Sequence, residues 1–206
     1  MINVLEMLEK TTDKYGSKTA FADGEVQVTY SETVDFAGKI GSALAAGGTV
    51  RRAVAVLVAM GVRDLISFFG VVYSGNFYVP IDTEMPVERM LLIFETLNPI
   101  RIIVDGTTCD MDLGRYNDLK CSYEVLVSQE KNLALLHKIR RNAIDTDPVY
   151  ALFTSGSTGI PKGVIVCHRS IIDYAGWCVA TFDLSAEIVF GNQTPFYFSM
   201  SVLDIY

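Results

Sequence analysis

The stretch of this sequence that decides the fold runs from Thr154 to Gly163 and reads Thr-Ser-Gly-Ser-Thr-Gly-Ile-Pro-Lys-Gly. It brings four hydroxyl groups, three glycines and one lysine into ten residues. The β-branched and aromatic residues 149–153 before it, and the apolar residues 164–166 after it, predict strands. The stretch is therefore expected to be a tight connection at the end of sheet strands, where α/β proteins bind their ligands.

The chemistry of residues 154–163 suits a polyanion. Their glycines leave backbone N–H groups unobstructed, their hydroxyls donate hydrogen bonds, and Lys162 supplies one fixed positive charge. We therefore predict that the natural ligand is a nucleoside triphosphate. The alternative is a flexible surface loop of turn-forming residues, which would need neither Lys162 nor the stiffening Pro161. The spacing differs from that of a Walker A loop, and no Gly-x-Gly-x-x-Gly dinucleotide motif surrounds it.

An alternation of apolar segments earlier in the chain predicts an α/β fold. Three of these segments read as strands, residues 53–58, 77–81 and 101–105. The first has no polar interruption, as expected when helices cover both faces of a sheet. Helices are predicted between the strands, one capped by Asp64 and one opened by Pro86. This β-α-β-α-β succession predicts a layered, parallel-rich sheet with flanking helices.

Other local patterns lead to further structural predictions. Ser31 and Ser170 are interpreted as N-caps of additional helices, since each precedes an apolar helical pattern. Residues 122–127 are predicted to form a strand, and residues 133–139 a short helix. Trp177 is predicted to lie in the core rather than to contact a ligand.

Composition excludes several classes of function. Half of the residues are hydrophobic, the net charge is −7 and the isoelectric point is about 4.8, so the chain is predicted to be globular and to bind neither nucleic acid nor an anionic membrane. Glu6 and Glu9 argue against a signal peptide. The four cysteines are scattered without metal-ligand spacing, which predicts free thiols, a cytoplasmic location and no protein metal site.

Residues 154–164 resemble the phosphate loop of the AMP-forming adenylate synthetases, the superfamily of nonribosomal peptide adenylation domains, acyl-CoA synthetases and luciferases. Residues 28–32, 75–82 and 86–89 are similar to other segments of that superfamily. Residues 192–206 look most like the corresponding region of the D-alanine-activating ligases that charge a carrier protein. The resemblance spans nearly the whole chain.

This resemblance implies activation of a carboxylic acid, nearest in appearance to an amino acid, with ATP and Mg²⁺. The acyl-adenylate would then pass to the thiol of a phosphopantetheine carrier protein or of CoA. Lys162 matches the loop lysine and would be catalytic, offsetting charge on the departing pyrophosphate. The residues that would hold the phosphates are Thr154, Ser155, Gly156, Ser157, Thr158, Gly159 and Gly163. His168 is interpreted either as catalytic or as a helix-entry residue in a hydrogen bond.

The resemblance also implies a substrate pocket, and here the sequence departs from the family. The residues that match the pocket are Phe198, Ser199, Met200 and Leu203. Amino-acid-activating members carry an aspartate for the substrate ammonium where this chain has Ser199. Three explanations remain open: the substrate lacks an α-ammonium, another group meets it, or specificity has decayed. An aryl or fatty acid–CoA ligase and a nonenzymatic remnant of the fold are therefore retained as alternatives.

Length is the second departure, because the family's catalytic unit is much longer than 206 residues. Its ribose-binding aspartate and C-terminal lysine have no counterpart before Tyr206. We therefore expect residues 1–206 to form the N-terminal portion of an AMP-binding domain, with the C-terminal catalytic subdomain absent, and to be inactive alone. Self-association is also expected, because an apolar edge near residues 196–206 would be exposed.

Overall fold

A computed structural model describes residues 1–24, 26–154 and 161–206 of the chain. The α-helices are α1 (Leu5–Tyr15), α2 (Tyr30–Ala45), α3 (Val62–Tyr73), α4 (Val87–Leu97), α5 (Tyr123–Val127), α6 (Leu133–Arg141), α7 (His168–Phe182) and α8 (Val202–Ile205). The strands are β1 (Thr19–Ala22), β2 (Gln27–Thr29), β3 (Ala53–Val58), β4 (Phe77–Asp82), β5 (Arg101–Val104), β6 (Lys120–Ser122), β7 (Pro148–Thr154) and β8 (Lys162–Cys167). Short 3-10 helices are η1 (Gly106–Asp110), η2 (Gly114–Leu119) and η3 (Ser199–Ser201).

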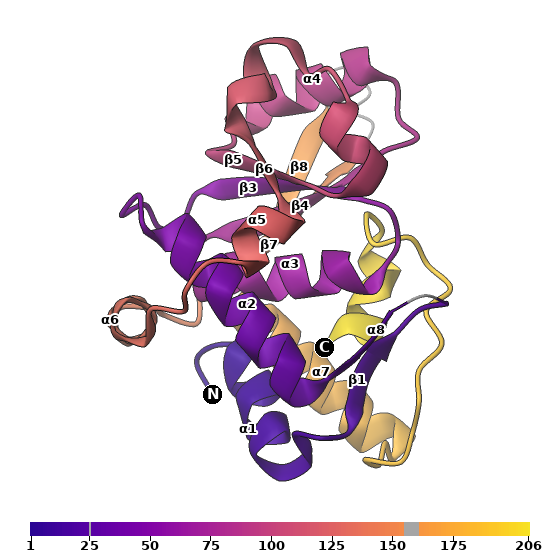
Figure 1. The fold of residues 1–206 in the computed structure, drawn as a ribbon. Coiled ribbons are helices and arrows are strands. Elements are labelled where there is room, and N and C mark those ends of the chain that lie inside the picture. Colours follow the sequence, from indigo (N-terminus) through magenta and orange to yellow (C-terminus); the bar gives the residue numbers. More distant parts are fainter. Residues whose placement is uncertain (25, 155–160) are drawn as a thin grey trace.

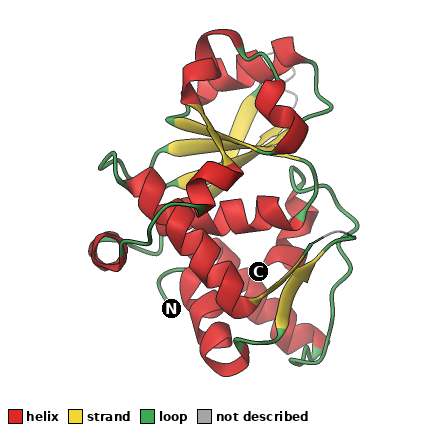
Figure 2. Cartoon of the chain, viewed as in Figure 1, coloured by secondary structure: helices red, strands yellow, loops and turns green. Residues whose placement is uncertain are grey.

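The described residues build one large sheet with the strand order β6-β5-β3-β4-β7-β8. Neighbouring strands from β6 to β7 are parallel, whereas β7 and β8 form an antiparallel pair. The predicted α/β fold with a parallel-rich sheet is therefore confirmed. A second, two-stranded sheet pairs β1 with β2 and lies beside α2, away from the large sheet (Figures 1 and 2).

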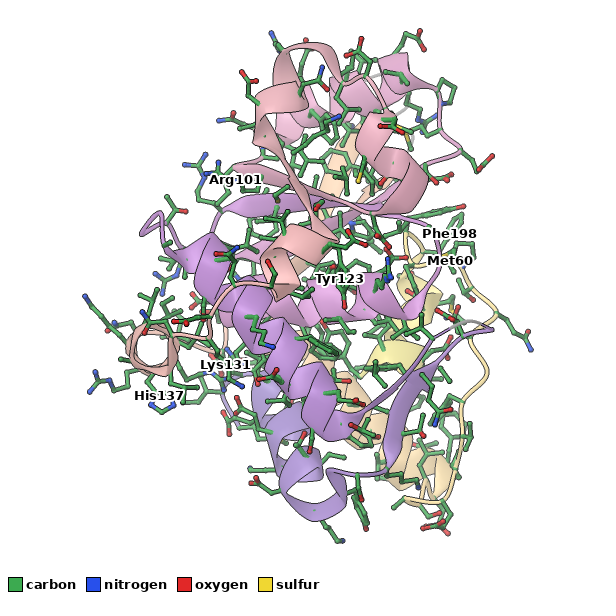
Figure 3. The ribbon with its side chains drawn as sticks, viewed as in Figure 1. Met60, Arg101, Tyr123, Lys131, His137 and Phe198 are labelled. Carbon is green, nitrogen blue, oxygen red and sulfur yellow. The ribbon has the colours of Figure 1, made fainter. Side chains whose placement is uncertain are left out.

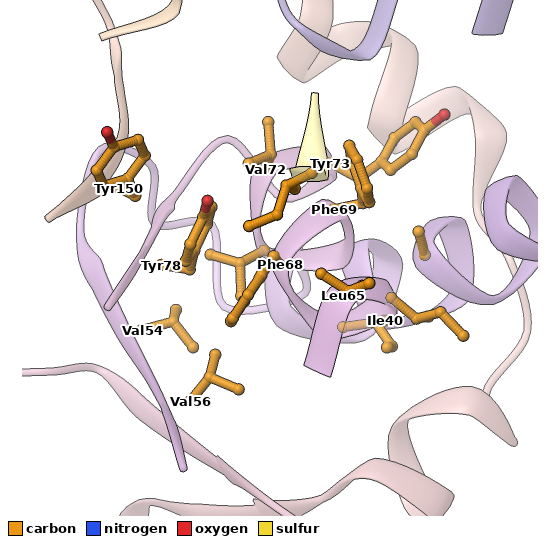
Figure 4. Packing of buried hydrophobic residues seen from close by; sticks show 14 of the residues in the cluster. Ile40, Val54, Val56, Leu65, Phe68, Phe69, Val72, Tyr73, Tyr78 and Tyr150 are labelled. Atoms are coloured by element: carbon orange, nitrogen blue, oxygen red, sulfur yellow. The ribbon is translucent and has the colours of Figure 1, made fainter. Parts of the chain in front are cut away.

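Helices cover both faces of the large sheet, which explains the uninterrupted apolar run in β3. Val54, Val56 and Val58 point into one core cluster together with α3, while the alternating residues Ala53, Ala55 and Leu57 point into a second cluster together with α4. Figure 4 shows the first cluster, in which the ring of Phe68 stacks on that of Tyr78 with their centroids 4.2 Å apart. A strand with both faces buried needs apolar side chains at every position.

The order of the strands places α3 and α4 on opposite faces of the sheet (Figure 1). From β3 the chain moves to β4 on one side, and from β4 it returns past β3 to β5 on the other side. Right-handed crossovers in opposite directions put their helices on opposite faces. The turns after β3 and β4 therefore diverge, and such a switch point leaves a crevice at the carboxyl ends of the strands.

Three local predictions are wrong, for reasons of capping and burial. Helix α2 is capped by Thr29 rather than Ser31, because Thr29 Oγ1 accepts the Glu32 N–H at 3.2 Å and the Glu32 carboxylate accepts the Thr29 N–H at 2.8 Å. Helix α7 begins at His168 after Cys167, so Ser170 lies within its first turn. Trp177 is 55% exposed, because α7 buries Ile171 and Cys178 on its other face.

The predicted strand over residues 122–127 is also wrong. Strand β6 ends at Ser122, and the side chain of Ser122 caps α5 by accepting the Val125 N–H at 3.3 Å. The apolar residues of α5 continue helically, and Tyr123 and Leu126 are buried. The short helix predicted over residues 133–139 is confirmed as α6, which continues to Arg141.

Candidate functional site

The predicted polyanion loop joins β7 to β8 at the carboxyl edge of the sheet. Thr154 is the last residue of β7, Lys162 is the first of β8, and the two are direct partners in the antiparallel ladder. Both are exposed. Because β7 runs parallel to β4, Thr154 lies at the edge where β4 ends. The structure therefore brings a hydroxyl and an ammonium group side by side at the predicted edge.

Five of the predicted phosphate-binding residues lie outside the described residues, namely Ser155, Gly156, Ser157, Thr158 and Gly159. Gly163 is described and pairs with Phe153 across the hairpin. A Cβ atom at Gly163 would lie 3.1 Å from Cζ of the Phe153 ring. A methyl group at this position would therefore fit only if the Phe153 ring moves slightly.

The turn between β3 and α3 lies at the same edge, and its backbone donors are already occupied. Asp64 Oδ2 accepts the N–H groups of Ala59 and Gly61, each at 3.0 Å. Asp23 Oδ2 accepts the Val62 N–H at 2.8 Å. Burial raises the pKa of Asp64 to about 6, although these N–H groups oppose the shift. Carboxylates of the chain itself therefore fill the helix terminus, where a phosphate would otherwise bind.

The C-terminal segment of the chain contacts the turns after β3 and β4. The Phe196 N–H donates to Met60 Sδ at 3.3 Å, and the Phe196 ring packs edge-to-face on Phe68, 5.7 Å between centroids. Burial, together with the Asp82 carboxylate, raises the pKa of Tyr197. Figure 3 shows Met60 and Phe198 close together beside this edge.

The residues predicted to line a substrate pocket follow this segment directly. Phe198 is 55% exposed, Met200 is 71% exposed and Ser199 is also exposed, while Leu203 is half-buried on α8. Ser201, between them, is buried and its hydroxyl donates to the Phe198 carbonyl at 2.7 Å. The predicted pocket residues are thus adjacent at the carboxyl edge, with three of the four side chains turned toward solvent.

Two cavities lie at the other edge of the sheet, near α6. Their volumes are about 300 and 210 Å³, and both are lined by Gly75, Ile139 and Asp147. Gly75 precedes β4 and Asp147 precedes β7, so both cavities face the amino ends of these strands. Neither cavity includes Thr154, Lys162 or the pocket residues.

His168 lies at the far end of the β7–β8 hairpin from Lys162. The Val4 N–H donates to His168 Nδ1 at 3.2 Å, and Asn3 Nδ2 lies 3.2 Å from Nε2. Burial lowers the pKa of His168 to about 4, so the ring is neutral near pH 7. Of the two interpretations of His168, the structure supports the helix-entry residue, which ties the start of the chain to α7.

Among the described residues, no group of three or more His, Cys, Asp and Glu side chains could hold a metal ion. Cys109, Cys121, Cys167 and Cys178 are free thiols. No described helix has the length and apolar character needed to cross a membrane.

Comparisons with known proteins point to one family. A family model described as AMP-binding enzyme matches residues 8–206. The D-alanine–D-alanyl carrier protein ligase of Bacillus cytotoxicus is 29% identical over 210 residues, which cover 100% of this chain and 40% of that protein. The ligase of the same name from Listeria monocytogenes is 34% identical over 149 residues, covering 69% of this chain and 28% of that protein. The chain thus spans 40% of the length of the first of these relatives.

Solved structures share the fold at low identity. The nonribosomal peptide synthetase FmoA3 superposes with a TM-score of 0.86 at 19% identity, covering 99% of this chain and 21% of that chain. A fatty acyl-adenylate ligase from L. pneumophila, solved with acyl adenylate and pyrophosphate, gives a TM-score of 0.76 at 20% identity, covering 98% of this chain and 38% of that chain.

Proposed function

The chain belongs to the AMP-binding enzyme family, and from this premise we propose that it takes part in the ATP-dependent activation of a carboxylic acid as an acyl-adenylate. The names of the D-alanine–D-alanyl carrier protein ligases favour an amino acid as substrate. They also favour transfer of the acyl group to a carrier protein. The thiol of a phosphopantetheine arm is proposed as the acceptor group, with CoA as the other acceptor.

The observation that carries the proposal is the pairing of Thr154 with Lys162 at the carboxyl edge of the sheet. In the proposed reaction a carboxylate oxygen attacks the α-phosphorus of ATP, and pyrophosphate leaves with the electron pair of the broken P–O bond. Lys162 offsets the charge on the leaving pyrophosphate, and Thr154 donates a hydrogen bond to it. Positioning and charge neutralisation account for most of the catalysis in such transfers.

The glycines and hydroxyls of residues 155–159 and Gly163 are proposed to complete the phosphate site. Mg²⁺ is proposed as cofactor. The described residues contain no group of three or more acidic, His or Cys side chains suited to a metal ion. The ion would therefore be held mainly by phosphate oxygens and water, as is usual for Mg²⁺ bound with nucleotides.

Ser199 supports the alternative in which an aryl or fatty acid is activated. Its hydroxyl carries no charge for a substrate ammonium, and Phe198 and Met200 beside it are apolar and exposed. Amino acids and their deaminated analogues are the substrates that separate these two versions of the proposal.

Self-association of the chain is also proposed, but through β8 and α7 rather than through residues 196–206, where Phe196, Val202 and Ile205 are buried. Val164 and Ile165 are 58% and 61% exposed on β8, whose outer edge pairs with no strand among the described residues. Trp177 and Phe182 are exposed on the neighbouring α7. An open strand edge with apolar side chains favours pairing between copies. Light scattering over a range of protein concentrations tests this, and a constant monomer mass would contradict it.

The test of the proposed function is acid-dependent exchange of labelled pyrophosphate into ATP. It is measured on the complete polypeptide that the gene encodes and on the 206-residue chain, across amino, aryl and fatty acids. We expect exchange with one class of acid, strongly reduced in Lys162→Ala. Exchange absent with every acid in the complete polypeptide would instead support a nonenzymatic remnant of the fold.

A further inference from the structure

The turn between β3 and α3 contains a residue in an unfavourable backbone conformation. Met60 has a φ of +65°, in the left-handed region that residues other than glycine rarely adopt. Arg51, before β3, shares this conformation with a φ of +57°, whereas Asn98 and Asp183 adopt it where they end helices α4 and α7, where it is usual. Met60 ends no helix. Such strain persists where the surrounding structure enforces it, and it concentrates at functional sites.

The backbone on both sides of Met60 is held by the buried carboxylate of Asp64. Asp64 Oδ2 accepts the Ala59 N–H and the Gly61 N–H, each at 3.0 Å, so the turn is closed around one oxygen atom. Asp64 itself is anchored in the first turn of α3, at a buried position. The backbone of Met60 is therefore held at the carboxyl edge of the sheet.

The sulfur of Met60 accepts a hydrogen bond from a segment far along the chain. The donor is the Phe196 N–H at 3.3 Å, 136 residues away in sequence. Phe196 is buried, and a turn from Pro195 to Phe198 follows, closed by the Phe198 N–H on the Pro195 carbonyl at 2.9 Å. Ser199 comes next, so the position of this turn determines where the predicted pocket residues begin.

We propose that Met60 is a positioning residue that fixes the turn over Pro195 to Phe198 and thereby sets the affinity of the site for its carboxylic acid. The effect on acid affinity rests on the proposed function, whereas the positioning of the turn does not. The thioether is a weak acceptor. Phe196 is a buried residue and Met60 is 38% exposed, so their contact is partly buried, and loss of the acceptor would leave a partly desolvated donor unpaired. Methionine is needed at this position for its acceptor, while its backbone conformation would favour glycine.

Two variants separate positioning from a merely structural role. Met60→Leu keeps an apolar side chain of similar size and removes the acceptor. Met60→Gly removes the acceptor and also relieves the strain at φ +65°. We expect the Phe196 amide to exchange its hydrogen about tenfold faster in both variants, while the amides of Val56 and Ile66 stay protected. The melting temperature of Met60→Gly should be equal to or above that of the parent protein.

Kinetics of pyrophosphate exchange on the complete polypeptide provide the second measurement. We expect KM for the acid to rise about tenfold in both variants, with KM for ATP unchanged, because Lys162 and Thr154 belong to a different turn. An unchanged KM for the acid would overturn the inference while leaving the proposed function intact. Unchanged exchange of the Phe196 amide would overturn it regardless of activity. A parent protein without exchange activity would refute the proposed function and, with it, the role of Met60 in acid affinity.

Discussion

Two turns at the same edge of the sheet differ in what they offer to an anion. In the β3–α3 turn, the backbone N–H groups of Ala59, Gly61 and Val62 already donate to the carboxylates of Asp64 and Asp23. In the β7–β8 turn, Thr154 and Lys162 are exposed and face each other across the hairpin. A helix N-terminus alone is thus no guide to a phosphate site in this fold, because side-chain carboxylates can occupy it first. The lysine and the hydroxyl group at its ends are the reason why we propose the second turn as the phosphate site.

Of the changes considered, replacing Lys162 in the second turn should have the largest effect on activity. Lys162→Ala removes the positive charge of the second turn, and hydrogen bonds to charged groups contribute about 1.5–3 kcal/mol. Pyrophosphate exchange should therefore fall by about 10- to 150-fold. Lys162→Arg retains the charge and should keep a larger share of the activity. If Lys162→Ala exchanged pyrophosphate as fast as the parent protein, the second turn would not be the phosphate site.

The stability of the protein should respond to pH through Asp64 and His168 with opposite signs. The pKa of Asp64 is about 6 in the folded state against its ordinary value of 3.8, so the folded protein binds an extra proton between these pH values. Asp64 therefore lowers stability as pH rises from about 4 to 6. The pKa of His168 is about 4 against 6.5, so His168 lowers stability as pH falls from 6.5 toward 4.

Removing one of the two groups should leave the dependence of stability on pH that the other group causes. Asp64→Asn should lose about 2 kcal/mol more than the parent protein on acidification from pH 6.5 to 4, because His168 is then unopposed. His168→Gln should show the reverse change, since only the Asp64 contribution remains. Urea unfolding across this pH range measures both. Parallel stability curves for the two variants would mean that the pKa values of Asp64 and His168 are not shifted in opposite directions by folding.

A methyl group at Gly163 should disturb the second turn without altering its charge. The added Cβ would lie 3.1 Å from Phe153 Cζ, which is too close unless the ring shifts. We expect Gly163→Ala to lower the free energy of unfolding by about 1 kcal/mol. Gly47→Ala is the matched control, because no atom lies within 4 Å of its added Cβ. Phe153→Leu should rescue Gly163→Ala in a double-mutant cycle, and additivity of the two changes would exclude the contact.

The sequence predicted the elements that depend on local patterns. The strand over residues 53–58 is reproduced residue for residue, because full burial on both faces leaves a signal in every position. The hairpin that joins Thr154 to Lys162 was predicted to lie at the end of sheet strands, although its antiparallel pairing was not foreseen. Edge strand β8 carries the same kinds of apolar residues as a central strand, so its local sequence does not reveal that its side chains are exposed.

The parts that could not be predicted depend on contacts between distant segments. His168 meets Asn3 across 165 residues, and Met60 meets Phe196 across 136 residues. Nothing beside Met60 in the sequence indicates that its sulfur accepts a hydrogen bond. Ser170 does not cap α7, because the helix already begins at His168 after Cys167, and only the folded backbone shows where it starts.

The smallest expected effect concerns Ser199, which follows the turn that contacts Met60. Ser199→Asp adds a carboxylate at the position where amino-acid-activating relatives are expected to carry one. Because Ser199 is exposed, solvent screens the new charge, and the gain for a substrate ammonium should be about 0.2–1 kcal/mol. The preference for an amino acid over its deaminated analogue should therefore rise by about 1.5- to 5-fold.

The control is Ser199→Asn, whose side chain has nearly the same shape as that of Ser199→Asp but no charge, and it should leave this ratio unchanged. If Ser199→Asp and Ser199→Asn gave the same ratio as the parent protein, Ser199 would not face the α-position of the substrate. The carboxyl edge would then contribute its phosphate turn alone to the site, and the acid would be selected by residues elsewhere.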